Sequence, residues 1–351
     1  MIDSLPDPAE EGLEAGVTTG RVCAHHHLYS ALARGMPAPA RTAHNFTDIL
    51  ELVWWRLDCA LDIEMIRWSA MLGALEALER GTTAIVDHHS SPNAIEGSLS
   101  VIADACAEVG VRSSCCYEVT DRNGPEAMAA GLAENERFLR SGGHGFVGAH
   151  ACFTLSQASL EAVAGLAAEL GRGVHIHVAE DGVDAAAGER LQGIAQDDWL
   201  LAHCVHLDRP LRGTVAHNPR SNMNNAVGYA RPARWVNNVV LGTDGIGGDM
   251  LEEFRIAYVR HREDDVTATP ELAWSWLENG SVLFPEVADD KVRWSYAPMD
   301  PWHLAFTPGV QPLEVTVAGE LVLKEGRPTR VDPLEVRARA HEQAQRLWAR
   351  L

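Results

Sequence analysis

The sequence predicts an α/β fold and, within that class, a closed (β/α)8 TIM barrel. Eight short apolar runs of strand length alternate with Ala/Leu/Glu-rich segments of helical spacing along the 351 residues. Most of the 16 histidines lie at or just past the ends of these runs, which is where barrel enzymes build their active sites. Glycines mark several of the turns from helix to strand, namely Gly81, Gly110, Gly145 and Gly173. An open, doubly wound sheet is the alternative fold.

The elements follow one another in a regular order. The predicted strands cover residues 21–27, 82–88, 111–117, 145–150, 173–177, 199–203, 214–217 and 239–244. The clearest helical segments between them cover residues 66–80, 98–109 and 156–170. We therefore assign residues 21–309 to the barrel domain.

The sequence at the two ends of the chain supports fewer structural predictions. Residues 313–323 alternate between apolar and polar side chains, and Lys324-Glu325-Gly326 after them is typical of a hairpin. This pattern predicts a small β annex at 310–331. A last segment, 332–351, contains a predicted helix (335–351) that packs back on the barrel. Residues 1–20 show no strand pattern.

Composition excludes several classes of partner. The formal net charge of −20 argues against binding to a nucleic-acid backbone or an anionic membrane. No uninterrupted apolar run is long enough to span a bilayer, and the acidic N-terminus lacks the apolar core of a secretory signal. The seven cysteines contain no CxxC pair, so neither a zinc knuckle nor a disulfide framework is indicated. We expect a cytoplasmic protein with reduced thiols and a small-molecule substrate.

Histidines and a carboxylate at the strand ends predict a metal centre that activates water. His25 and His27 are two residues apart in a predicted strand, so both side chains can face one ion while His26 points away. His177 and Asp244 end two later strands. Imidazole nitrogens and a carboxylate are suitable ligands for a divalent ion such as zinc.

Five ordered motifs carry a resemblance to the amidohydrolase superfamily. The chain resembles its branch of guanine, cytosine and 8-oxoguanine deaminases and triazine chlorohydrolases, and is most similar to the SsnA-type aminohydrolases, through residues 28–36, 54–58, 87–93 and 221–228. The motifs are His25-x-His27, His177-x-x-Glu180, His203-Cys204-Val205-His206, His217-Asn218-Pro219-x-Ser221-Asn222 and Gly242-Thr243-Asp244.

The resemblance implies a role for each of these positions. His25, His27, His177 and Asp244 would hold one divalent ion, Zn²⁺ first and Fe²⁺ as the alternative. His203 would stabilise the developing oxyanion, Glu180 would shuttle protons, and Asp244 would also act as a base. Many relatives carry two metals bridged by a carboxylated lysine. The only lysines here, Lys291 and Lys324, follow the last predicted strand, so the sequence excludes that class.

The expected activity is hydrolytic deamination of a small nitrogen heterocycle or cyclic amidine. Hydrolysis of a cyclic amide or a C–Cl bond is the first alternative, and a non-catalytic ligand-binding relative is the second. His88, His89 and His150 are expected to contact the ligand residues and fix their orientation. The expected substrate contacts are Arg34, Trp54, His217, Ser221 and Asn222, although Arg34 could instead be a solvated arginine and Trp54 a core residue.

Relatives build a β-sandwich from both chain termini, and the few residues before the first predicted strand are too short for their share of it. We therefore expect an annex reduced to a hairpin, or an open strand edge covered by a second subunit in a homodimer or larger homo-oligomer.

Overall fold

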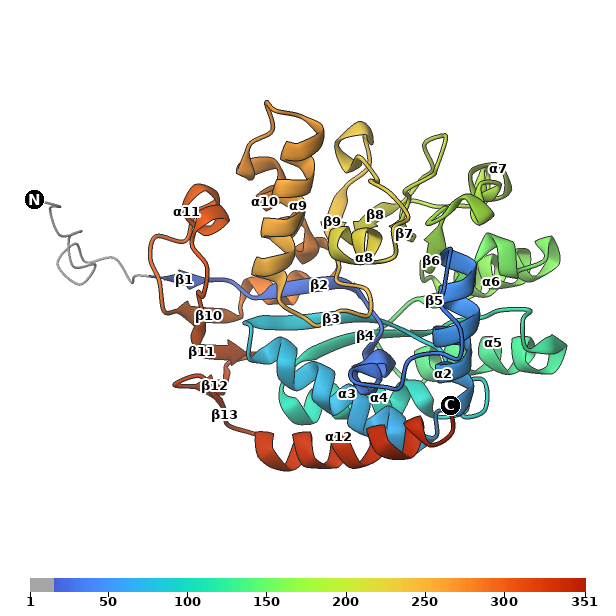
Figure 1. Cartoon of the computed structure of the whole chain (residues 1–351), viewed down its shortest axis with the longest axis horizontal. Helices are drawn as coiled ribbons and strands as arrows, with labels where there is room; N and C mark the ends of the chain where they lie inside the picture. Colours follow the sequence, from blue (N-terminus) through green and yellow to red (C-terminus); the bar gives the residue numbers. More distant parts are fainter. Residues whose placement is uncertain (1–15) are drawn as a thin grey trace, which may run out of the picture.

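Eight parallel strands form the centre of the computed structural model, which describes residues 16–351. They fall into a three-stranded sheet, β2-β3-β4, and a five-stranded sheet, β5-β6-β7-β8-β9 (Figure 1). Their bounds are β2 Arg21–His26, β3 Thr82–His89, β4 Arg112–Tyr117, β5 Val147–Ala151, β6 Val174–Val178, β7 Leu200–His203, β8 Thr214–His217 and β9 Val239–Leu241. All eight predicted strands are present within a few residues of their predicted bounds, which confirms the α/β class.

Isolated parallel bridges join the two sheets at both seams. At one seam Val119 pairs with Ala149, and the Val119 N–H donates to the Gly148 carbonyl at 3.2 Å. At the other, His26 pairs with Asp244, and the Asp244 N–H donates to the His25 carbonyl at 3.0 Å. The strands therefore follow one another around a ring, as a barrel requires and an open sheet does not.

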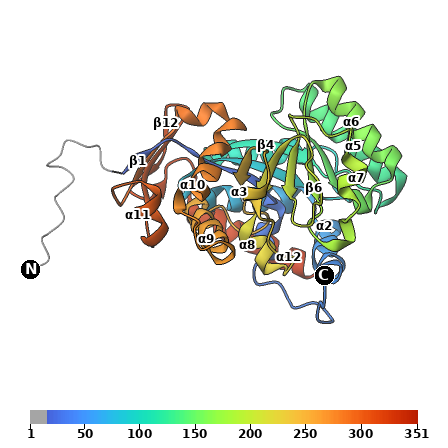
Figure 2. The same cartoon turned by 90° about the horizontal axis from the view of Figure 1, so that it is seen from above.

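Helices surround this ring. Figure 2 shows α5, α6 and α7 at one end of the molecule, opposite α11 and β12. The helices are α1 Phe46–Ile49, α2 Trp55–Ala60, α3 Ile63–Leu78, α4 Ser98–Val109, α5 Gly124–Arg140, α6 Gln157–Leu170, α7 Ala187–Leu191, α8 Pro219–Asn224, α9 Met250–Asp264, α10 Pro270–Glu278, α11 Pro301–Phe306 and α12 Pro333–Trp348. The predicted helix at 98–109 coincides with α4, which ends at Gly110 in the left-handed region (φ 100°). No helix in the described part of the chain is long and apolar enough to cross a membrane.

A third sheet, outside the barrel, is antiparallel and has more strands than the predicted hairpin. Its order is β1-β10-β11-β12-β13, with bounds β1 Val17–Thr18, β10 Lys291–Trp294, β11 Pro312–Val317, β12 Glu320–Lys324 and β13 Arg327–Pro328. The predicted hairpin is β11-β12. The expectation that residues 1–20 lack a strand is wrong for Val17 and Thr18, because a two-residue strand has no periodicity that could reveal it; residues 1–15 lie outside the described part.

Helix α12 lies along α3, as Figure 1 shows. The Trp348 indole N–H donates to the Leu32 carbonyl at 2.9 Å, and Arg346 pairs with Asp62 and Glu64 on α3 and its N-cap. The division into domains at residues 310 and 332 stays a prediction, since the small sheet also takes strands from outside 310–331.

Candidate active site

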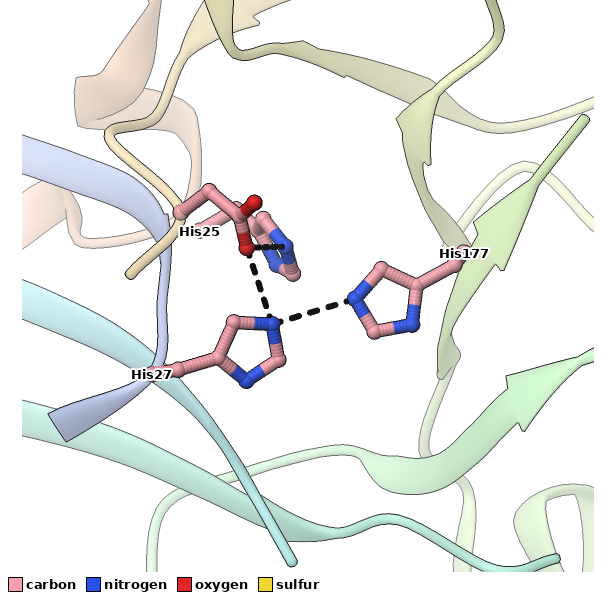
Figure 3. A group of neighbouring side chains, drawn as sticks. His25, His27 and His177 are labelled. Carbon is pink, nitrogen blue, oxygen red and sulfur yellow. Dashed lines mark hydrogen bonds and ion pairs between the residues drawn. The ribbon is translucent and has the colours of Figure 1, made fainter. Parts of the chain in front are cut away.

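Three imidazoles and one carboxylate converge at the carboxyl end of the strands. His25 lies in β2, His27 directly after it, His177 in β6, and Asp244 follows β9. Asp244 Oδ1 lies 3.3 Å from His25 Nε2 and 2.9 Å from His27 Nε2, and the His27 and His177 Nε2 atoms are 3.1 Å apart (Figure 3). The structure thus brings together all four side chains that the sequence proposed as ligands.

Backbone carbonyls orient two of these rings. Nδ1–H of His27 donates to the His88 carbonyl at 2.6 Å, and Nδ1–H of His177 donates to the His150 carbonyl at 2.9 Å. In the neutral rings both Nε2 atoms then carry a lone pair, and these lone pairs face each other. Burial lowers the pKa of His177 well below 6.5, and the neighbouring His88 and His25 lower it further, which keeps the ring neutral.

Two facing lone pairs repel unless a proton or a metal ion lies between them; although burial acts to lower it, the Asp244 carboxylate raises the pKa of His27 to about 9, so a proton on His27 fills this place when no ion is bound. Three Nε2 atoms and one carboxylate also form the donor set that zinc and other borderline divalent ions prefer, with each ring held through its other nitrogen. The residues present therefore fit a single divalent ion.

Glu180 and His203 lie beside this cluster. His203 Nε2 is 3.6 Å from Glu180 Oε2, and both residues offer an atom within 4.8 Å of the Asp244 carboxylate. Ala179 has a positive φ of 44°, a turn that separates the strand carrying His177 from Glu180. Burial raises the pKa of Glu180 to about 7. The neighbouring His203 acts to lower this pKa, and the Asp244 carboxylate acts to raise it. A carboxyl with that pKa can both give and take a proton near neutrality.

A pocket opens over the cluster and holds about 840 Å³, including its open mouth. Two of the proposed substrate contacts, Trp54 and Ser221, line it together with the aromatic side chains of Phe46, Trp55 and Phe153. Ser221 Oγ donates to Asp244 Oδ2 at 2.5 Å. The pocket therefore places aromatic side chains beside the residues that the sequence proposed as metal ligands and acid–base groups.

The model of the Amidohydrolase family matches residues 17–277 of the chain. This protein belongs to the amidohydrolase family. A 5'-deoxyadenosine deaminase of Methanopyrus kandleri is 30% identical over 97% of this chain and 89% of its own length. A 5-methylthioadenosine/S-adenosylhomocysteine deaminase of Desulforudis audaxviator is 31% identical over 75% of this chain and 66% of its own length.

Solved structures share the fold of this amidohydrolase. An adenosine deaminase from Xanthomonas campestris with bound zinc superimposes with a TM-score of 0.79 at 22% identity, covering 95% of this chain and 86% of that one. An atrazine chlorohydrolase from Arthrobacter aurescens complexed with zinc gives a TM-score of 0.74 at 19% identity, covering 97% and 92%. The family match and the deaminase relatives, rather than these structures, show that the amidohydrolase is an enzyme, a hydrolase that acts on C–N bonds of a non-peptide substrate.

Three of the proposed substrate contacts lie elsewhere in the amidohydrolase. Arg34 follows a 3₁₀ helix, Leu28–Ala33, that turns it outward: its side chain is 58% exposed and pairs with Glu76 at 2.8 Å, so the expected approach to the substrate is corrected. His217 is fully buried beside the rings of Tyr229 and Trp276 and does not line the pocket.

Asn222 is also absent from the pocket lining. Its Oδ1 accepts from His203 Nδ1 at 2.8 Å, so it orients His203 where a substrate contact was expected. His88 and His150 do orient ligand rings, but through their backbone carbonyls. His89 contacts Ser91 Oγ at 2.9 Å instead.

Sequence reasoning missed a group of buried charges across the pocket. Arg122 donates through Nη2 to Asp58 Oδ2 at 3.0 Å and to Glu118 Oε1 at 3.3 Å, and its guanidinium stacks on Trp55 at 4.6 Å. Glu118 Oε2 lies 3.4 Å from His88 Nδ1. The available signal was the position of Glu118, one residue past a predicted strand end. We call Asp58, Glu118 and Arg122 the acidic wall.

Proposed function

We propose that this amidohydrolase is a mononuclear zinc deaminase. It replaces the exocyclic amino group of a nitrogen heterocycle with oxygen, consuming water and releasing ammonia. The convergence of three Nε2 atoms and the Asp244 carboxylate, with Glu180 and His203 alongside, carries the proposal. The names of the relatives supply the first substrates to test, 6-aminopurine nucleosides such as 5'-deoxyadenosine. Hydrolysis of a cyclic amide or a chlorinated ring is the alternative activity.

The cluster residues would hold the ion, and the neighbouring residues would handle protons. A divalent ion held by His25, His27, His177 and Asp244 would supply Lewis-acid activation of the attacking water. Asp244 Oδ2, fixed by the Ser221 hydroxyl, is the acceptor for the proton that water loses. Each proton that Asp244 accepts must be passed on before the next turnover.

Glu180 is the second proton carrier. Its Oε2 would protonate a ring nitrogen as water adds to the carbon, and later the departing amine, which then leaves as ammonia. His203 donates through Nδ1 to Asn222, and its Nε2 points to Glu180; with a proton on Nε2, the ring would stabilise the oxygen on which negative charge develops. The aromatic side chains of Trp54 and Phe153 would cover the ring faces and exclude water.

The decisive experiment replaces the proposed proton carrier. Glu180→Gln should lower the rate of ammonia release by about two to four orders of magnitude while leaving about one zinc ion per chain, because Glu180 is not a ligand. Glu189→Gln, an exposed glutamate, is the matched control and should behave as the wild type. Retained activity in Glu180→Gln with intact metal would remove Glu180 from the mechanism.

A substrate panel then separates the possible reactions. Ammonia from aminated heterocycles supports the deaminase, whereas chloride release or ring opening without ammonia would keep the hydrolase and contradict the deamination. Elemental analysis of the purified protein decides between zinc and iron, and two ions per chain would contradict the mononuclear site.

We also propose a homo-oligomeric enzyme of the cytoplasm without affinity for nucleic acids. The seven cysteines, all free, support a reducing compartment, and the charge of −20 supports the lack of affinity for polyanions. Light scattering during gel filtration tests the oligomeric state.

A further inference from the structure

The pocket over the metal cluster is lined by carboxylates on several sides. Its described lining contains Asp58, Glu118, Glu180, Asp181, Asp184 and Asp244 and neither an arginine nor a lysine. Arg34, the arginine that the sequence suggested as a substrate contact, lies outside this lining. An anionic group on a substrate would therefore meet carboxylates here without a cationic side chain to pair with.

Arg122 does not neutralise this lining from inside the pocket, because it lies behind the two carboxylates. Its side chain is 11% exposed and bonds both acids while stacking on Trp55. On the other side of Glu118, His88 directs Nε2 at the carbonyls of Ala149 and His175, so its Nδ1, 3.4 Å from Glu118 Oε2, pairs with the carboxylate only when both ring nitrogens carry a proton. These contacts hold Glu118 in place with its carboxylate ionised: although burial acts in the opposite direction, His150, His88 and Arg122 hold the pKa of Glu118 well below 4.5.

Asp58 adds an unsatisfied acceptor to the same wall. Its Oδ2 accepts from Ser90 Oγ at 3.1 Å and from Arg122 at 3.0 Å. Its Oδ1 is buried and has no hydrogen-bond partner among the described residues, and the residue is only 1% exposed. This oxygen is covered by the surrounding atoms, so Asp58 adds negative charge to the wall and does not itself contact a ligand.

The acidic wall is close to the reaction centre. Glu118, His150 and the ligand His177 each offer an atom, and these atoms lie within 4.8 Å of one another. A heterocycle positioned for attack beside His177 would therefore also lie next to Glu118. Its substituents have to match the charge of this wall.

We propose that Glu118, supported by the charge of Asp58, selects the substrate: the pocket takes neutral or cationic heterocycles that offer an N–H or O–H donor to Glu118, and it rejects substrates that carry a carboxylate. This selection rests on the proposed deaminase function, because it concerns the same pocket. It adds a substrate class that the metal cluster alone does not define.

A matched series of nucleosides tests the selection. Adenosine, 5'-amino-5'-deoxyadenosine and adenosine 5'-carboxylic acid share one ring and differ in the charge at one position. With the zinc-loaded enzyme, kcat/KM for the carboxylate should be at least about 30-fold below that for adenosine, while the amine should equal or exceed adenosine. Equal values for the carboxylate and adenosine would overturn the selection.

The variant Glu118→Gln tests whether Glu118 causes the discrimination against the carboxylate substrate. It keeps the shape of the side chain and should reduce discrimination against the carboxylate by about tenfold. Glu169→Gln, an exposed glutamate, should leave the ratio unchanged. An unchanged ratio in Glu118→Gln would exclude Glu118 as the selecting residue.

Calorimetric binding of the same three compounds distinguishes this selection from the deaminase proposal. If none releases ammonia but the amine and adenosine bind at least about 30-fold more tightly than the carboxylate, deamination of this ring fails and the charge selection stands. Preferred binding of the carboxylate, or binding of none of the three, would overturn the selection as well.

Discussion

The pocket has two walls that are built in different ways. The metal side, defined by His25, His27, His177 and Asp244, takes its side chains from strands or strand ends, and backbone carbonyls orient two of the rings. The acidic wall takes Asp58 from α2 and Glu118 and Arg122 from the loop after β4, and ion pairs hold these side chains to one another. The first wall is positioned by the barrel backbone, and the second by its own charges.

Because the two walls are held in place differently, we expect substitutions in them to have different effects on function and stability. Loss of one side chain on the metal side leaves the barrel intact and should remove function, whereas loss of the central charge on the acidic wall leaves buried carboxylates unpaired and should lower stability. Substitutions on each side test this difference.

The largest expected effect is on the metal side. His177→Ala should lose the bound ion and reduce ammonia release by at least about 1000-fold, because the remaining three ligands bind a divalent ion weakly. Its unfolding transition, measured without added metal, should stay close to that of the wild type. His341→Ala, an exposed histidine on α12, is the control. One ion per chain in His177→Ala, measured by mass spectrometry, would contradict the assignment of His177 as a ligand.

The acidic wall should show the opposite pattern. Arg122→Met should lower the free energy of unfolding in urea by about 3 kcal/mol, since it leaves the carboxylates of Asp58 and Glu118 buried without their cation. Arg140→Met removes only exposed ion pairs and should have little effect. The double variant with Glu118→Gln should recover part of the loss, and a simple sum of the single effects would contradict the proposed coupling.

The loss of stability in Arg122→Met should depend on pH in a direction that follows from the pKa of Glu118. The wild-type Glu118 has a pKa below its ordinary value of 4.5, so its contribution to stability is complete above pH 4.5 and is lost as the pH falls below that value. The difference between wild type and Arg122→Met should therefore narrow in acid. A constant difference between pH 7 and pH 4 would show that lost packing, not charge, causes the destabilisation.

The smallest effect is expected at the contact that supports the metal side. Ser221→Ala removes the hydroxyl that donates to Asp244 Oδ2 and should weaken metal affinity by about 10- to 100-fold in a competition with a chelator. Ser281→Ala, at an exposed serine, is the matched control. Unchanged affinity would show that the barrel backbone alone positions Asp244.

Much of this enzyme could be predicted from local patterns. The strands were found because each is a short apolar run whose neighbours along the chain are also its neighbours in the ring. The metal side followed from the same logic: the carboxyl ends of parallel strands meet at one mouth, so His25, His27, His177 and Asp244 had to lie close together. The predicted roles of these residues now depend on the experiments above.

Other features could not be predicted in this way. Arg34 was expected at the substrate because it follows the first ligands in sequence, but the direction of a short 3₁₀ helix turned it towards Glu76. Asn222 was expected to touch the substrate and instead holds His203. Each error concerns where a side chain points after a turn, which depends on contacts with segments far away in the sequence.

Hydrophobic periodicity and strand-end position are local properties of the chain, so they were enough to predict the barrel, the family and which side chains meet at its mouth. The tertiary structure decided the strand pairing of Val17 and Thr18, the outward position of Arg34, and the meeting of Asp58, Glu118 and Arg122. Asp58 lies on α2, far in sequence from Glu118 and Arg122 in the loop after β4, and the three charges interact strongly only because burial brings them within hydrogen-bond distance in a medium that screens them weakly.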